Sequence, residues 1–209
     1  RKRPFLLIDS GANVDCLPKY LVQFGMMGSV YMHRILGVDE PRVGLVNIGA
    51  EAEKGNQLTK ETFKLMQAQA QFRFEGNVEA RDIPSGDIDV VVADGFAGNL
   101  ILKYTEGLAQ ALVGMLKDEI QSSRKSMLGA AMMKDAFQSF KARMDYEEQG
   151  GAPLLGVNGA VVKAHGSSTA RAFKNAIGQA YRMVKTGMVA EIEKGIAEIA
   201  QAEKKEENA

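Results

Sequence analysis

Four short apolar runs in this chain each end at polar residues close to glycine. The runs are residues 5–8, 43–46, 90–93 and 161–162. Uninterrupted apolar runs bounded by turn residues are typical of strands that are buried on both faces, as in a parallel sheet. In such sheets, ligands bind beyond the carboxyl ends of the strands, where these polar and glycine residues would lie. The pattern therefore predicts an α/β protein whose functional site follows one edge of the sheet.

The segments between these runs have helical spacing or turn residues. We expect helices over residues 15–36, 59–71, 99–122, 173–184 and 189–199. A short strand is expected over 74–80, and a polar tail over 203–209. Residues 154–157 and 160–165 are predicted to pair through an Asn-Gly turn at 158–159. With no internal repeat, the 209 residues are interpreted as one α/β domain.

Residues 124–148 continue the helical pattern but change in character. Their broad apolar face includes Met127, Leu128, Met132, Met133 and Phe137, with lysines between them. We interpret residues 120–150 as a protruding helical hairpin. Methionine-rich helices pack adaptably against a second copy of the chain, whereas apolar side chains beside lysines also suit a lipid surface. A dimer interface and a membrane contact are therefore both expected uses of this segment.

Composition excludes some classes of partner. Lys plus Arg and Asp plus Glu number 26 each, so no net field attracts nucleic acid, and we expect no nucleic-acid partner. No apolar run approaches the roughly 20 residues of a spanning helix, and no secretory signal is recognised. The sequence starts with Arg-Lys-Arg-Pro directly before the first expected strand. We interpret it as the carboxy-terminal portion of a longer chain.

Cysteine and histidine are scarce. The single Cys16 excludes an internal disulfide and suits a reducing cytoplasm. No histidine is near it in the sequence, so we expect a buried or incidental thiol rather than a nucleophile. His33 falls inside an expected helix and is interpreted as structural or exposed. With two histidines and no cluster at ligand spacing, no zinc site is predicted.

Two loops at the expected sheet edge have groups suited to an anion. Residues 94–99 (Asp-Gly-Phe-Ala-Gly-Asn) and 165–168 (His-Gly-Ser-Ser) each join a strand to a helix. Backbone N–H groups and a helix N-terminus can together bind an anion there. Neither loop is a P-loop or a G-x-G-x-x-G fingerprint, so neither specifies a nucleotide. The competing interpretation is that Asp94, Asn99 and Ser168 only cap helices.

His165 directly follows an expected strand, so we expect it at the rim of the sheet. Imidazole transfers protons near neutral pH, and its N–H groups can stabilise an oxyanion. Lys163 can balance the charge of an anion, and Ser167 and Ser168 can donate hydrogen bonds to it. These four side chains are candidates for chemistry.

Taken together, the polar segments resemble a known family. Residues 9–15 (Asp-Ser-Gly-Ala-Asn-Val-Asp) are similar to its D-x-G-A-N-x-D loop. Further segments match in order along the chain, at residues 24–31, 41–49, 54–56, 76–82, 94–99, 156–159 and 165–168. The chain thus resembles the bacterial phosphate acyltransferases of the PlsX type, the acyl-carrier-protein:phosphate acyltransferases of phospholipid synthesis.

The resemblance implies a three-layer α/β/α, Rossmann-like fold with a mostly parallel sheet, similar to phosphotransacetylases and the isopropylmalate dehydrogenase group. It implies transfer of a long acyl group from acyl carrier protein to inorganic phosphate, which gives an acyl phosphate. It also implies a cytoplasmic homodimer that associates peripherally with the membrane, and we expect no cofactor. Family members carry an amino-terminal half with a D-A-M-G-G-D loop, which this sequence lacks.

Residue chemistry and the resemblance together give the expected site. Catalytic roles are expected for His165, Lys163 and Ser167, with His165 or Lys163 stabilising the oxyanion or protonating the leaving sulfur. The expected substrate-binding residues are Asp9, Asn13, Asp94, Gly95, Gly98, Asn99, Asn158 and Ser168. Because phosphate is itself a nucleophile, no serine or cysteine nucleophile is required, and positioning carries much of the catalysis.

Two other functions fit parts of the pattern. A nicotinamide-dependent dehydrogenase on a related fold would need clustered aspartates for a metal and an adenine pocket, and the sequence indicates neither. A non-catalytic module that binds acyl carrier protein or phosphate would bind the carrier but release no free thiol when phosphate is present. A thiol-release assay separates all three functions.

Overall fold

A four-stranded parallel sheet forms the centre of the protein. The computed structural model describes residues 4–144 and 150–207, and side chains of 4–140 and 150–202. The strands are β1 (Leu6–Ile8), β2 (Arg42–Asn47), β3 (Arg73–Glu79) and β4 (Val90–Val92), in the order β1-β4-β2-β3. Val91 of β4 pairs with Leu7 on one side and Gly44 on the other. The predicted α/β class with a parallel sheet is confirmed, and its assignment to a Rossmann-like superfamily stays a prediction.

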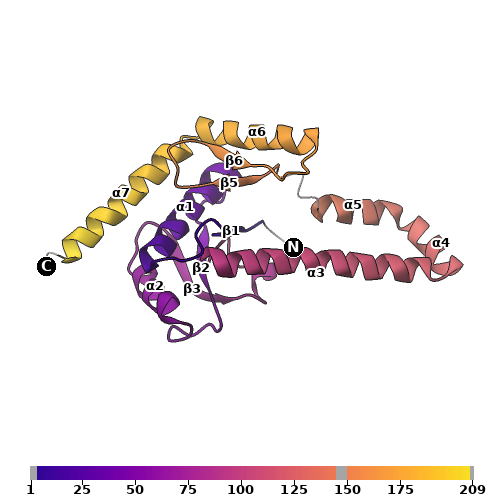
Figure 1. Cartoon of the computed structure of the whole chain (residues 1–209), viewed down its shortest axis with the longest axis horizontal. Coiled ribbons are helices and arrows are strands. Elements are labelled where there is room, and N and C mark those ends of the chain that lie inside the picture. Colours follow the sequence, from indigo (N-terminus) through magenta and orange to yellow (C-terminus); the bar gives the residue numbers. More distant parts are fainter. Residues whose placement is uncertain (1–3, 145–149, 208–209) are drawn as a thin grey trace.

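Helices connect the strands of this sheet and make up most of the chain after β4 (Figure 1). They are α1 (Pro18–Leu36), α2 (Gln57–Gln67), the short 3₁₀ helix η1 (Ile83–Ser85), α3 (Gly95–Gln121), α4 (Arg124–Met132), α5 (Lys134–Met144), α6 (Ala170–Lys185) and α7 (Met188–Glu207). Strands β5 (Ala152–Leu154) and β6 (Val161–Lys163) pair antiparallel as a second, two-stranded sheet.

The run at residues 161–162 is therefore not a strand of the parallel sheet, and that expectation was wrong. Val161 is 44% exposed, because β6 pairs only with β5 among the described strands. Two apolar residues are too few to separate a buried strand from a half-exposed one by pattern. Two strands pair here as predicted, but β5 covers 152–154 instead of 154–157, so residues 155–160 form a longer connection than the expected two-residue turn.

Helix boundaries differ from the expected ones in physically understandable ways. α3 starts at Gly95 instead of 99, because Asp94 caps it. The long helix expected over 124–148 is divided at Met133 into α4 and α5, and its expected end, residues 145–148, lies outside the described residues. α7 continues to Glu207, where a polar tail was expected from residue 203.

Helix α1 forms the main core against one face of the sheet. Its buried residues include Leu21, Met26 and Met32, and α7 packs on it from the other side with Ile192 and Ile199. A Cβ added at Gly28 would overlap the side chain of Val90, so only glycine allows this close approach of helix and sheet. The opposite face of the sheet carries a smaller apolar cluster, to which Ile101 of α3 contributes.

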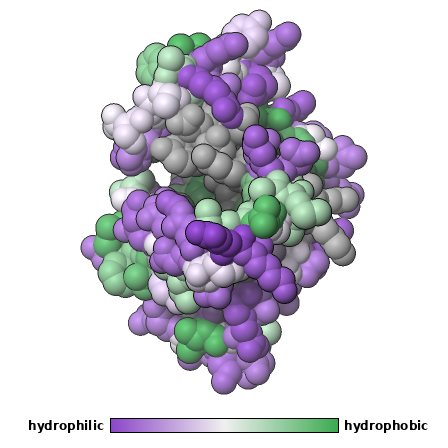
Figure 2. Space-filling model, turned by 90° about the vertical axis from the view of Figure 1, so that its right-hand side faces the viewer, coloured by the Kyte–Doolittle hydropathy of each residue, from purple (hydrophilic) through white to green (hydrophobic). Residues whose placement is uncertain are grey.

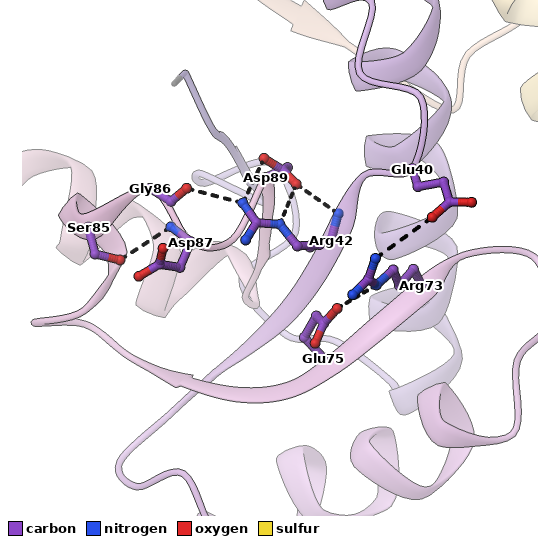
Figure 3. A network of polar contacts seen from close by, with 8 residues as sticks. All are labelled: Glu40, Arg42, Arg73, Glu75, Ser85, Gly86, Asp87 and Asp89. Carbon is purple, nitrogen blue, oxygen red and sulfur yellow. Dashed lines mark hydrogen bonds and ion pairs between the residues drawn. The ribbon is translucent and has the colours of Figure 1, made fainter. Parts of the chain in front are cut away.

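The amino ends of β2 and β4 are joined by an ion pair (Figure 3). The buried carboxylate of Asp89 accepts hydrogen bonds from the backbone N–H and Nε of Arg42, both at 3.0 Å. Nη2 of Arg42 also donates to the carbonyl oxygen of Gly86 at 3.2 Å. The bond to Asp89 is the main reason why the pKa of the guanidinium is raised. This contact fixes the strand ends at the edge opposite the expected site.

Helix α3 leads away from the sheet, and α4 and α5 follow at its far end (Figure 1). Most of its apolar side chains are exposed, including Tyr104, Leu112 and Met115. The chain returns from this extension to the β5–β6 hairpin and α6, which lie beside α1.

Candidate functional site

The loop after β1 is organised by one buried carboxylate. Asp9 is 8% exposed and follows a cis peptide bond with Ile8. Its carboxylate accepts hydrogen bonds from the backbone N–H groups of Gly11, Ala12 and Asn13, at 3.0, 3.0 and 2.6 Å. Nδ2 of Asn13 donates to the same carboxylate at 3.0 Å. Asp9 thus holds the loop in shape and turns the amide of Asn13 toward itself.

The start of α3 packs directly against this loop. The side chain of Asp94 accepts a hydrogen bond from the N–H of Ala97 at 2.6 Å and caps the helix. The N–H of Gly95 donates to the carbonyl oxygen of Asn13 at 2.8 Å. A Cβ at Gly98 would overlap the carbonyl oxygen of Asp9, so the two loops approach too closely for any side chain. The structure therefore brings Asp9, Asn13 and residues 94–98 together.

This contact leaves fewer backbone donors than the sequence suggests. The N–H groups of Gly95, Ala97 and Gly98 donate to acceptors within the two loops. The capping interpretation thus holds for Asp94. Asn99 is exposed, and its side chain lies beside the position that a Cβ of Gly11 would take. Side-chain amides and the helix dipole remain to attract an anion here.

The loop after β2 lies at the same edge and has its own buried amide. Asn47 is buried, its Nδ2 donates to the carbonyl oxygen of Lys54 at 3.1 Å, and its Oδ1 accepts from the N–H of Ile48. The role of Asn47 in organising this loop was not predicted from the sequence. Its position at the end of an apolar run, before a glycine-bounded loop, was the available signal.

Burial and nearby negative charges raise the pKa of the Cys16 thiol, which lies beside these loops. Its thiol donates to the carbonyl oxygen of Asn13 at 3.3 Å. Burial is the first reason why its pKa is raised, and the charges of Asp94, Asp9 and Asp15 raise it further, against a hydrogen bond from Gly95. The thiol is therefore protonated at neutral pH and is not an activated nucleophile. An anion bound beside these carboxylates needs a cation from elsewhere.

The connection from β6 to α6 forms a second polar group. Nδ1 of His165 lies 2.7 Å from Oγ of Ser167 and accepts a hydrogen bond from the N–H of Ser167 at 3.2 Å. Because Nδ1 is an acceptor, the proton of the neutral ring is on Nε2. His165, Lys163 and Ser167 are all exposed. The side chain of Thr169, not Ser168, caps α6, so the capping interpretation of Ser168 was wrong.

Two predicted residues of this second group have different surroundings. Oγ of Ser168 is buried and has no hydrogen-bond partner within the described part of the chain. Asn158 is exposed on the connection between β5 and β6. The hydrogen bonds between His165 and Ser167, and from the N–H of Ser168 to the carbonyl oxygen of His165, stay within residues 163–168, whereas Asp9 and Asp94 accept from their own two loops. The predicted site residues thus form two groups, each internally ordered.

The apolar side chains predicted for dimer or membrane contact are mostly on the surface. Met132 is 89% exposed, and Met127, Leu128 and Met133 are more than half exposed, whereas Phe137 is half-buried. Figure 2 views the molecule from this side and shows hydrophobic residues in separate patches among hydrophilic ones. Within residues 4–144 and 150–207, no helix combines the length and apolarity needed to cross a membrane. In the same part of the chain, no three His, Cys, Asp or Glu side chains are grouped to hold a metal ion.

Known proteins with similar sequences are consistent in name. The family model described as "Fatty acid synthesis protein" matches residues 1–191. A phosphate acyltransferase of Clostridium botulinum is 52% identical over 200 residues, which are 96% of this chain and 59% of that protein. A phosphate acyltransferase of Clostridium acetobutylicum is 50% identical over 199 residues, 95% of this chain and 60% of the relative. The chain spans about three fifths of the length of these curated relatives. It therefore belongs to the PlsX-type phosphate acyltransferase family of fatty acid synthesis proteins.

Proposed function

We propose that this chain acts in the transfer of a long acyl group from acyl carrier protein to inorganic phosphate. The family match over residues 1–191 and relatives named phosphate acyltransferase support acyl transfer to phosphate. The resemblance adds the acyl-carrier thioester as donor and the acyl phosphate as product. The observation that carries the proposal is the contact of the Asp9 loop with the start of α3 at the carboxyl edge of the sheet, where ligands bind in parallel α/β folds.

In the proposed reaction, a phosphate oxygen attacks the thioester carbonyl carbon and the carbon–sulfur bond breaks. The electron pair stays on sulfur, which takes a proton and leaves as the thiol of the carrier. The oxyanion of the tetrahedral intermediate is stabilised by donors aimed at it. Since phosphate is the nucleophile, the protonated Cys16 and its raised pKa are consistent with a thiol that takes no part.

The two carboxylates have positioning roles in this proposal. Asp9 accepts four hydrogen bonds from its own loop, and Asp94 caps α3, so both place donors instead of touching phosphate themselves. Phosphate lies near the amides of Asn13 and Asn99 and the positive end of the α3 dipole. Gly95 and Gly98 allow the approach of the two loops.

The second polar group supplies what the first lacks. Because the Asp9 and Asp94 loops are negative, a phosphate there needs a positive partner. Lys163 and His165 are exposed and can supply a cation and a proton on Nε2. Ser167 and Asn158 are exposed and contribute further hydrogen bonds. The proposal thus requires both groups to contact one substrate pair.

Acyl-phosphate formation tests the proposal. The natural protein that carries this sequence is supplied with acyl carrier protein thioester and phosphate, and both acyl phosphate and free thiol are measured. His165→Ala and Ser167→Ala are expected to lower the rate by about 10²-fold or more, as loss of a proton donor or oxyanion donor does. Unchanged rates in both variants contradict these catalytic roles. Carrier binding without thiol release shows a non-catalytic module instead.

We further propose that the extension of α4 and α5 contacts a second copy of the chain and, peripherally, the cytoplasmic membrane surface. Its exposed methionines and leucine lie beside lysines, which suits an interfacial segment. Met132→Asp together with Met133→Asp is expected to reduce flotation with anionic vesicles. Flotation equal to that of the unchanged protein refutes the membrane role, and sedimentation velocity of the same variant tests the dimer.

A further inference from the structure

The outer face of α6 carries an apolar stripe. Among the described residues, the stripe belongs to neither of the two hydrophobic core clusters. Phe173, Ile177, Tyr181 and Val184 are 58–67% exposed and follow one another at intervals of four, four and three residues. At 3.6 residues per turn, these positions fall on one side of the helix. The stripe thus runs almost the whole length of α6.

This stripe is not what attaches α6 to the protein. The helix is held by its other face, where Ala172, Ala176 and Met183 are buried. On that face, Nε2 of the buried Gln179 donates to Oη of Tyr31 in α1 at 2.7 Å. Because the inner face anchors the helix, the apolar outer face is not needed to hold α6 on the described part of the chain.

Cations follow one side of the stripe. Lys174, Arg182 and Lys185 each come directly after a member of the stripe, so each lies about 100° further around the helix in the same sense. All three are exposed. Nζ of Lys185 lies 5.9 Å from the centre of the Tyr181 ring. Helix α6 contains no Asp or Glu, although the chain as a whole has equal numbers of acidic and basic residues.

We propose that the outer face of α6 docks a small acidic protein that presents an amphipathic helix with apolar and carboxylate strips side by side. An apolar strip with cations along one flank matches such a helix in both hydrophobicity and charge. An apolar strip beside cations also suits a lipid surface, so vesicle binding is measured as the competing outcome. This inference rests on the proposed function, in which the acidic partner is the acyl carrier.

The position of α6 agrees with that role. Thr169, its cap, directly follows Ser168, and the N–H of Ser168 donates to the carbonyl oxygen of His165 at 3.0 Å. A partner bound along α6 is therefore next to the loop with the proposed proton donor. A thioester on a flexible arm of that partner can reach the loop from there.

Direct binding tests the inference. Purified holo acyl carrier protein is titrated against the natural protein by surface plasmon resonance at low and high salt. We expect Lys174→Glu together with Lys185→Glu to weaken binding by about tenfold or more, and Ile177→Ser to weaken it as well. Added salt is expected to weaken the unchanged protein more than the charge-reversed one. The matched control, Lys60→Glu with Lys64→Glu on exposed positions of α2, is expected to bind as the unchanged protein does.

Each result decides between distinct conclusions. Equal binding by the α6 variant and the unchanged protein overturns the inference, as does absence of carrier binding by the unchanged protein. Loss of binding to phosphatidylglycerol vesicles with carrier binding intact also overturns it and identifies a membrane surface. If binding depends on α6 but no acyl phosphate forms, the docking surface stands and the proposed function fails. If acyl phosphate forms with an unchanged KM for the acyl carrier in the α6 variant, the function stands and the docking surface fails.

Discussion

Each edge of the parallel sheet has a buried carboxylate, and the two carboxylates have different kinds of partner. At the amino edge, Asp89 is 2% exposed and faces the guanidinium of Arg42 (Figure 3). At the carboxyl edge, Asp9 is nearly as buried, but it accepts its hydrogen bonds from N–H groups of its own loop. The first carboxylate is neutralised by a charge, and the second only by dipoles.

The contact at the amino edge serves stability, whereas the carboxylate at the carboxyl edge also affects the electrostatics of the candidate site. An ion pair with matched hydrogen bonds joins two strands and leaves no net charge to attract a ligand. A carboxylate held by dipoles keeps its negative charge, which contributes to the raised pKa of the nearby Cys16 thiol. The charge at the amino edge is thus balanced within the protein. At the carboxyl edge the negative charge is not balanced by a cation, so an anionic substrate there needs a positive partner.

The largest expected effect concerns the close approach at the carboxyl edge. Gly98→Ala places a methyl group on the carbonyl oxygen of Asp9, and we expect a loss of about 4 kcal/mol or more in the free energy of unfolding. Gly107→Ala in the same helix meets no atom within 4 Å. That control is expected to gain about 0.5–1 kcal/mol, because alanine favours a helix over glycine. Urea denaturation of both variants measures the difference, and equal stabilities contradict the close packing of Gly98 on the Asp9 loop.

The amino edge is tested by removing its carboxylate. Asp89→Ala leaves the partly buried guanidinium of Arg42 without its main partner, and we expect a loss of about 2–3 kcal/mol, discounted for the partial exposure of Arg42. Asp87→Ala, at an exposed position two residues earlier, is the control. A loss for Asp89→Ala no greater than that of the control means that the ion pair does not stabilise the strand ends.

Asp9→Asn sharpens the comparison at the carboxyl edge with a smaller change. The amide has one acceptor oxygen instead of two, so it satisfies fewer of the four donors, and we expect a loss of about 1–2 kcal/mol. Asp15→Asn, in an exposed position of the same loop, is expected to be neutral. If Asp9 positions Asn13 for phosphate, KM for phosphate rises in the first variant, while KM for the acyl donor does not. A proportional change in both constants points to unfolding of the loop instead.

The smallest expected effect is on the titration of Cys16. Its folded-state pKa is raised, so it contributes stability that is fully present below the ordinary pKa of a thiol and is lost as the pH rises through the raised value. Iodoacetamide at pH 8 is therefore expected to alkylate Cys16 several-fold more slowly than a free cysteine peptide. Cys16→Ser removes this contribution to the alkaline decline in stability. Alkylation as fast as that of the peptide contradicts a negative, partly desolvated environment.

The sequence predicted the parallel sheet because three of its runs are continuous, apolar and bounded by turn residues. Residues 5–8, 43–46 and 90–93 all contain strands of that sheet. The fourth run failed because two valines do not specify their partner, and the β5–β6 hairpin is determined by tertiary packing on α1. The break at Met133 was also missed, since apolar spacing continues across it while the backbone turns.

For the candidate site, the sequence predicted that the Asp9 and Asp94 loops lie at the carboxyl edge of the sheet, but it did not predict their internal contacts. Asp9 and Asp94 were predicted to bind substrate, which stays a prediction, and the motif did not reveal that their oxygens accept N–H groups of their own loops. Hydrogen-bond direction within a loop depends on backbone geometry, which a motif does not contain. The expected place of His165 beside these loops depended on β6 belonging to the parallel sheet, and β6 pairs with β5 instead.

Helix α3 is long and is held at its amino end by the contact of Gly98 with the Asp9 loop. Its 27 residues extend for about 40 Å from Gly95. A tilt of about 10° at that end would therefore sweep Gln121, and α4 with it, through about 7 Å. A spectroscopic probe on α4 would therefore detect rearrangements of the Asp9 loop that are too small to detect in the loop itself.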